Sequence, residues 1–201
     1  MKLTRLLPLV PLLISLSSPA FGADEGKIGK LTVEEFNKTT DAGVDQIKAV
    51  KATETPLNDV DKKWLTDITS TSMMQMEAAR VAIEKSDSKD IKTFAQADLN
   101  VSKSLTEKLQ EIAKAKGTEA PSKLSAKMEK DIADLRAKSG KGLDAAYLMV
   151  AGVQGNEALW LQLSKLEKAT KDEDLKSLLK GALPLVRMHT KAAKAESEDD
   201  D

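Results

Sequence analysis

Apolar residues recur at steps of three and four along most of the chain after residue 58, which is the repeat of an amphipathic α-helix. No window shows the sustained alternation of apolar and polar residues that is typical of a strand. Long helices with short connections pack as antiparallel neighbours. We therefore predict an all-α fold, an antiparallel four-helix bundle with an extra short helix before the third long helix. The long helices are expected over residues 60–85, 89–116, 143–169 and 173–195, and the short one between residues 122 and 138.

The segment before the bundle, residues 23–58, has no clear repeat. Val44, Ile47 and Val50 indicate a short helix, but glycines such as Gly43 interrupt the pattern. We expect this segment to be a partly ordered leader.

The bundle domain is expected to occupy residues 59–195. Pro184 lies inside its last helix and removes a backbone donor, which predicts a kink. Residues 196–201 are mostly acidic, and such a run is usually solvated, so we predict an acidic disordered tail.

The N-terminus has the layout of a secretory signal peptide. Lys2 and Arg5 precede an apolar run over residues 6–16, and a small-x-small sequence ends at Gly22. The apolar run is shorter than the roughly 20 residues that a membrane-spanning helix needs. We predict a signal peptide over residues 1–22 with cleavage after Gly22, a periplasmic location, and no stable membrane insertion after cleavage.

The amino-acid composition excludes several kinds of functional site. The chain has no cysteine and one histidine, which excludes disulfides, thiolate chemistry and a multi-histidine metal centre. Its 31 basic and 32 acidic residues leave a net charge of −1, which does not favour nucleic-acid binding. Phosphate-binding glycine motifs and the H-E-x-x-H motif are absent from the sequence. We expect no catalytic residues, no cofactor and no nucleic-acid partner.

Polar residues and glycine interrupt the apolar stripes of the predicted helices. Helical bundles form their internal binding sites from such inward-facing positions. A lone histidine on such a stripe is most often a hydrogen-bonded core residue; a metal ligand and a pH-sensing group are the alternatives. The glycines Gly152 and Gly155 indicate either close helix approach or a pocket. The interrupting residues are Gln75 with Glu77 on its flank, Asp98, Ser102, Gly155 and His189.

Short blocks of sequence between residues 58 and 194 carry a family resemblance. They are Trp64-Leu65, Met73 to Glu77, Phe94-Ala95-Gln96, Ala113 to Gly117, Ser139-Gly140, Leu143-Asp144-x-Ala146-Tyr147, Asp174-Leu175-Lys176, Leu183-Pro184 and Arg187-x-His189. In this spacing the chain resembles the secreted bacterial family catalogued as domain of unknown function 4142. The resemblance implies a ferritin-like four-helix bundle.

Members of that family typically carry an Asp-His pair on the second helix and another on the long third helix. This chain has Val101-Ser102 and Gln154-Gly155 at those positions and keeps only His189. It therefore resembles a member that lacks most of the family's inward histidines, and we expect it to have lost any metal site built on them.

These observations favour a non-enzymatic periplasmic helical-bundle protein, a binding, structural or stress-associated module. Its partner would be an unknown envelope protein or a small ligand. The alternative is a metal- or redox-linked ferritin-like protein, whose residual ligands would be Glu77, Asp98 and His189. A lipid-binding surface would need a helix with a basic polar face beside a broad apolar one, and the charges along the sequence are mixed.

Overall fold

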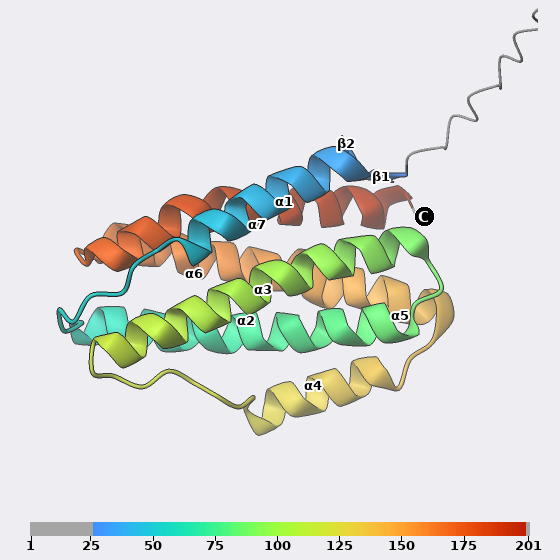
Figure 1. The fold of residues 1–201 in the computed structure, drawn as a ribbon. Helices are drawn as coiled ribbons and strands as arrows, with labels where there is room; N and C mark the ends of the chain where they lie inside the picture. The colour runs from blue at the N-terminus through green and yellow to red at the C-terminus, as the bar shows by residue number, and fades with distance from the viewer. Residues whose placement is uncertain (1–25, 200–201) are drawn as a thin grey trace, which may run out of the picture.

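The structure is a computed structural model that describes residues 26–199. The predicted signal peptide, its cleavage after Gly22, and residues 200–201 of the predicted tail lie outside the described residues. Within the described part the fold is all-α apart from one two-stranded hairpin, as the sequence predicts (Figure 1). The elements are β1 (Lys27–Ile28), β2 (Leu31–Thr32), α1 (Val33–Lys48), α2 (Asp59–Lys85), α3 (Lys89–Ala115), α4 (Ala126–Arg136), α5 (Gly140–Tyr147), the π-helix η1 (Leu148–Gly155), α6 (Asn156–Ala169) and α7 (Glu173–Asp199).

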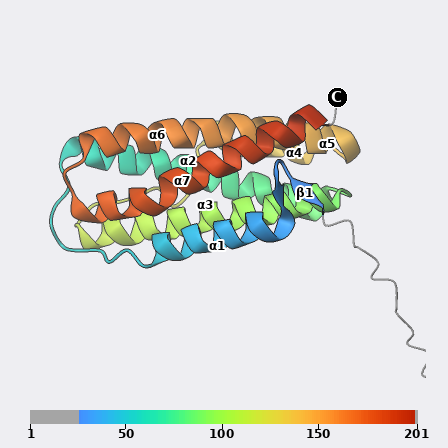
Figure 2. The same cartoon turned by 90° about the horizontal axis from the view of Figure 1, so that it is seen from above.

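The long helices pack side by side as a bundle. Short turns join α2 to α3 and α6 to α7, which makes each pair antiparallel. The third long helix is a continuous run of α5, η1 and α6, and the predicted short helix before it is α4. Seen from above, α7 lies between α6 and α1 (Figure 2). The predicted bundle and its extra helix are therefore confirmed.

Polar side chains cap the helices. Asn58 accepts a hydrogen bond from the backbone N–H of Asp61 at 2.9 Å, so the side chain of Asn58 caps the start of α2. The carboxylate of Asp172 accepts from the backbone N–H groups of Asp174 and Leu175, at 3.1 and 3.0 Å. These acceptors satisfy amide groups that have no partner inside the helix. They fix where α2 and α7 begin.

The segment expected to be a partly ordered leader instead contributes a full helix, α1, which packs on α3 and α7. Gly43, which we interpreted as an interruption, lies against Leu185 of α7. A Cβ atom at Gly43 would lie 2.7 Å from Cδ2 of Leu185, so any larger residue here would force Leu185 to move. The sequence interpretation failed because it treated this glycine as a helix breaker, whereas its role is close packing between two helices.

The C-terminal prediction also needs correction. Helix α7 continues through Pro184 and extends to Asp199, so residues 196–199 of the expected disordered tail are helical. At this end Glu196 accepts a hydrogen bond from the backbone N–H of Gly29, in the β1–β2 turn, at 2.6 Å. The hairpin thus gives the end of α7 a partner that its sequence does not reveal.

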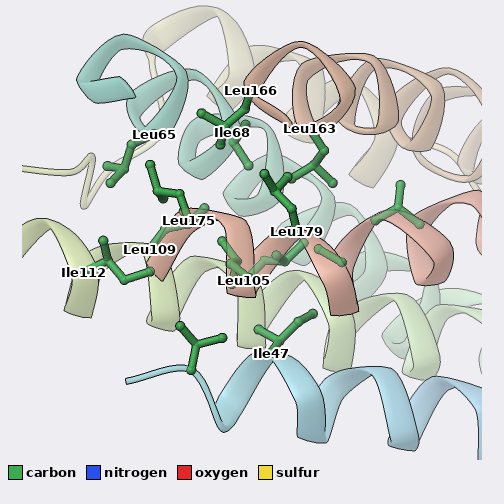
Figure 3. Packing of buried hydrophobic residues seen from close by; sticks show 14 of the residues in the cluster. Ile47, Leu65, Ile68, Leu105, Leu109, Ile112, Leu163, Leu166, Leu175 and Leu179 are labelled. Carbon is green, nitrogen blue, oxygen red and sulfur yellow. The ribbon is translucent and has the colours of Figure 1, made fainter. Parts of the chain in front are cut away.

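Two apolar clusters fill the interior. One contains aliphatic side chains such as Leu105, Leu163 and Leu179 (Figure 3). The other contains Phe36 and Phe94 together with many alanines. Between them lies a set of buried polar residues contributed by five helices, which we name the polar layer. The polar layer consists of Thr40, Ser72, Gln75, Asp98, Ser102, Asn156 and His189.

Candidate functional site

A chain of hydrogen bonds runs through the polar layer and joins four helices. Nδ1 of His189 lies 2.6 Å from Oδ1 of Asp98, and Nε2 lies 3.0 Å from the hydroxyl of Thr40. The hydroxyl of Tyr147 donates to the second oxygen of Asp98 at 2.9 Å. An ionised carboxylate only accepts hydrogen bonds, so the Nδ1–H group of the ring donates to Asp98. Thr40, His189, Asp98 and Tyr147 therefore form one connected unit.

Aromatic rings shield this unit from water. The ring of His189 lies 4.9 Å from that of Phe36 and 5.8 Å from that of Phe94, between centroids. Burial disfavours ionisation of Tyr147, and the charge and hydrogen bond of Asp98 disfavour it further, so the pKa of Tyr147 is well above its usual value. The phenol remains protonated and continues to donate to Asp98.

A second group of contacts joins α2 to the π-helix η1 and to the start of α6. The side-chain amide of Gln75 donates to Oδ1 of Asn156 at 3.1 Å and to the backbone carbonyl of Ala151 at 3.3 Å. Asn156 in turn donates to the carbonyl of Gly152 at 3.0 Å. A π-helix widens the backbone and is frequent at functional positions. Here it places backbone carbonyls within reach of side chains from α2 and α6.

Gly155 ends the π-helix directly beside Gln75. A Cβ atom at Gly155 would lie 2.9 Å from Nε2 of Gln75 and 3.0 Å from the carbonyl oxygen of Val150. This agrees with the expectation that glycine here allows close helix approach. The amide of Gln75 thus occupies the space into which a larger side chain at Gly155 would extend.

The residual metal ligands considered from the sequence are only partly brought together. Asp98 and His189 are in contact, but Glu77 lies on the surface, where its carboxylate pairs with Arg80 at 2.6 Å. Across residues 26–199 no group of three or more His, Cys, Asp or Glu side chains is placed to hold a metal ion.

The sequence pattern does not indicate Thr40, because this residue lies in the segment expected to be a leader, and it assigns no role to Tyr147 or Asn156. A buried tyrosine hydroxyl normally finds a hydrogen-bond partner, so the single tyrosine on an apolar stripe was a usable signal. Thr40 carried no comparable signal.

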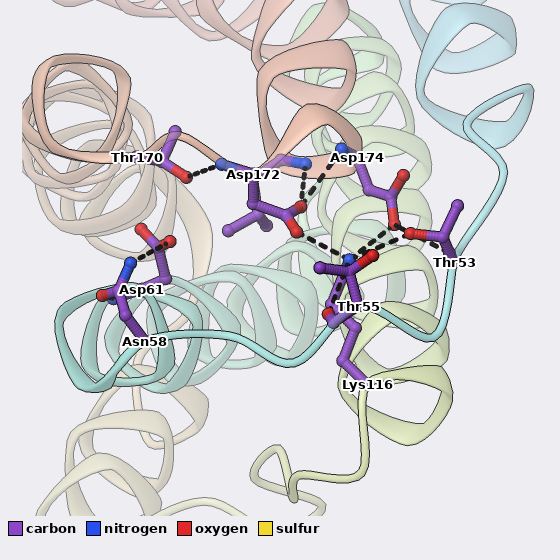
Figure 4. Close-up of polar contacts among 9 residues, drawn as sticks. Thr53, Thr55, Asn58, Asp61, Lys116, Thr170, Asp172 and Asp174 are labelled. Atoms are coloured by element: carbon purple, nitrogen blue, oxygen red, sulfur yellow. Dashed lines mark hydrogen bonds and ion pairs between the residues drawn. The ribbon is translucent and has the colours of Figure 1, made fainter.

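A separate polar cluster closes one end of the bundle (Figure 4). The ammonium group of Lys116 lies 2.7 Å from Asp172 and 2.8 Å from Asp174, and its side chain is fully buried. Burial disfavours the charge of Lys116, but the two carboxylates outweigh it and raise the pKa of Lys116. Burial likewise opposes the charge of Asp174, but hydrogen bonds from Lys116 and Thr53 lower the pKa of Asp174. The cluster ties α3, α7 and the segment before α2 together and is structural.

The outer surface of α7 carries three basic residues at helical spacing, Arg187, Lys191 and Lys194, which we name the cationic ridge. Lys194 pairs with Glu157 at 2.5 Å. Among residues 26–197, whose side chains the structure describes, no carboxylate lies within 4.0 Å of the basic groups of Arg187 or Lys191, and we call these two charges unmatched in that sense.

Grooves lie on both sides of the cationic ridge. The groove toward α6 has a volume of about 390 Å³ and is lined by Trp160 and Leu161. The groove toward the β1–β2 hairpin has a volume of about 800 Å³ and is lined by Ile28, Leu31 and Met188. Trp160 and Leu161 are 38% and 48% exposed. This face therefore combines apolar side chains with unmatched positive charge.

The packed helices and the polar layer define an all-α helical-bundle protein. The family model described as "Domain of unknown function (DUF4142)" matches residues 46–195, and the chain belongs to this family. No curated protein and no solved structure matches the chain. Among residues 26–199, no helix has both the length and the apolar character that crossing a membrane requires.

Proposed function

We propose that this protein is a non-enzymatic binding module of the periplasm, in which the helical bundle is a scaffold and the grooves beside the cationic ridge are the binding surface. The proposal rests on the contrast between the buried histidine of the interior and the exposed apolar side chains of the surface groove. Both ring nitrogens of His189 contact buried side chains in the interior, whereas Trp160 and Leu161 are exposed beside the unmatched charges of the ridge.

The burial of the polar layer supports a non-enzymatic role. A catalytic acid or base must come within hydrogen-bond reach of its substrate. His189 is 0% exposed and Tyr147 is 0% exposed, and both are hydrogen-bonded to Asp98. The interior unit therefore holds the helices in place.

The periplasmic location rests on the N-terminal sequence and has a direct test. Osmotic-shock fractionation of a Gram-negative host is expected to release the protein with the periplasmic fraction, and N-terminal sequencing should start at Ala23. Retention in the cytosol with Met1 still present would contradict this part of the proposal.

The binding surface is tested with a photo-crosslinking amino acid placed at Leu161, in the groove toward α6. Lys92 is the matched control, since it is an exposed helical residue of α3, outside the lining of either groove. Irradiation of intact cells is expected to give an adduct from position 161 and none from position 92. No adduct, or the same adducts from both positions, would overturn the proposed surface.

A second function, a metal- or redox-linked ferritin-like protein, is favoured by the buried contact between Asp98 and His189. Such a site would have two ligands from this pair, because Glu77 pairs with Arg80 on the surface. Stoichiometric iron, manganese, zinc or copper in the purified protein, lost in His189→Ala, would support it. Metal far below one ion per chain would reject it.

A further inference from the structure

We propose that the groove between α6 and the cationic ridge binds a free, single-chain anionic amphiphile of the long-chain fatty-acid class. The carboxylate would lie on Arg187 and Lys191, and the hydrocarbon chain would lie along Trp160 and Leu161. This inference rests on the proposed binding function and specifies its ligand.

The charges of the groove favour an anion. Arg187 and Lys191 are exposed and lie one helical turn apart on α7, and no carboxylate of residues 26–197 pairs with either. Among the residues whose side chains are described, Glu157 is the only acidic one that lines the groove, and Lys194 matches its charge. An arginine and a lysine side by side can bind a carboxylate by charge-assisted hydrogen bonds. The ridge therefore supplies a head-group site.

The remaining lining favours a hydrocarbon chain. Trp160 and Leu161 are large apolar side chains that the bundle leaves exposed, although its other large apolar residues are mostly buried. Covering them would remove apolar surface from water, which is favourable in proportion to the area covered. The aliphatic stems of Arg187 and Lys191 add apolar surface below their charged ends. One ligand with a charged head and an apolar chain satisfies both parts of the groove.

Shape and size separate this ligand from larger partners. The groove volume of about 390 Å³ falls within the range of small-molecule sites, roughly 300–1,000 Å³. A partner protein usually covers about 800 Å² on each side of an interface. A bilayer is flat, whereas the apolar side chains here line a concave groove between two helices. A single amphiphile fits this geometry better than either.

The test uses intrinsic fluorescence of the full chain. The chain has two tryptophans, and Trp64→Phe leaves Trp160 in the groove as the only reporter. Titration with monomeric myristate at pH 7.5 is expected to change the Trp160 emission in a saturable manner. Removing methylenes from the ligand should weaken binding by up to about fourfold for each one. The neutral alcohol of the same chain length should bind at least tenfold more weakly than myristate.

Charge variants in the Trp64→Phe background locate the head group. Arg187→Gln combined with Lys191→Gln should weaken myristate binding at least tenfold. Lys180→Gln, an exposed lysine on the same helix outside both grooves, should leave binding unchanged. Circular dichroism of each variant confirms that it is folded.

Several results would overturn the inference. They are the absence of a saturable myristate response, equal binding of the neutral alcohol, and an unchanged affinity in the double variant. Binding only to anionic phospholipid vesicles would replace the free amphiphile by a membrane surface. If myristate fails while position 161 still crosslinks to a protein, the ligand class is wrong and the proposed binding function stands. If both experiments fail, the binding function itself is wrong.

Discussion

Asp98 and His189, 91 residues apart in the sequence, place Oδ1 and Nδ1 within 2.6 Å of each other at the centre of the bundle. The contact joins α3 to α7, and the side chains are 4% and 1% exposed. In the sequence both residues interrupt apolar stripes of predicted helices. The structure shows that they interrupt the stripes at the same level and interact with each other.

Removing the charge of Asp98 should destabilise the fold strongly. Asp98→Asn takes away the ionic acceptor shared by His189 and Tyr147, and disrupting a buried pair from one side costs about 3 kcal/mol. Urea unfolding at pH 7 measures the loss. Glu77→Gln is the control, because a surface pair contributes less than about 1 kcal/mol. Equal losses in the two variants would refute the structural role of the buried contact.

Tyr147 should resist ionisation at high pH. Its pKa in the folded protein is well above 10.0, so the stability that it contributes is fully present below pH 10 and is lost as the pH rises further, toward the folded-state pKa. It is the only tyrosine, so ultraviolet absorbance reports on it alone among phenols. We expect no tyrosinate signal near pH 10 until the protein unfolds. Ionisation at pH 10 in the folded state would contradict its burial against Asp98.

The lysine at the end of the bundle should be needed for stability. Lys116→Met leaves Asp172 and Asp174 close together without their cation and should cost about 3 kcal/mol. Lys114→Met, at an exposed position of the same helix, should change stability by less than about 0.5 kcal/mol. Thermal or urea unfolding compares the two. A mild effect at Lys116 would mean that the carboxylates find other partners.

The same cluster predicts how stability changes in acid. Because the pKa of Asp174 is lowered below 3.8 in the folded protein, its contribution is present above pH 3.8 and is lost as the pH falls through the folded value. Urea midpoints measured between pH 2 and 5 should show this loss in the parent protein. The acid dependence should be smaller in Lys116→Met, and an identical profile would argue against the assigned cause.

Two glycines should respond in opposite directions to alanine. Gly142→Ala meets no atom within 4 Å and should stabilise α5 by about 0.5 kcal/mol. Gly155→Ala brings a methyl group against Gln75 and the carbonyl of Val150 and should cost about 1–3 kcal/mol. Combining it with Gln75→Ala should recover part of that loss. The prediction fails if both single variants are stabilising.

The sequence was sufficient for the helices whose signals are local. Apolar periodicity placed α2, α3, α4 and α7 close to their observed bounds. Family membership was also predictable, because the short blocks that carry the resemblance lie within residues 46–195, which the family model matches. These features depend on neighbours along the chain.

Features that depend on contacts between distant segments were missed. The full length of helix α1 was not predicted, because a glycine such as Gly43 normally disfavours a helix. Its reason, the close contact with Leu185 of α7, is visible only in the fold. The π-helix gives no periodic signal of its own, and the side chains that donate to its carbonyls, Gln75 and Asn156, come from α2 and α6. Sequence identified Asp98 and His189 as a candidate site, but not Thr40, whose role follows only from the position of α1.

The polar layer also fixes the relative positions of the helices along the bundle axis. If one helix slid along its neighbours by a single turn, apolar side chains would still meet apolar side chains within the two clusters. At this one level, however, an amide, a carboxylate or an imidazole would be left facing hydrocarbon, and such a mismatch is costly. The seven residues of the polar layer therefore exclude shifted helix arrangements that the two apolar clusters alone would tolerate.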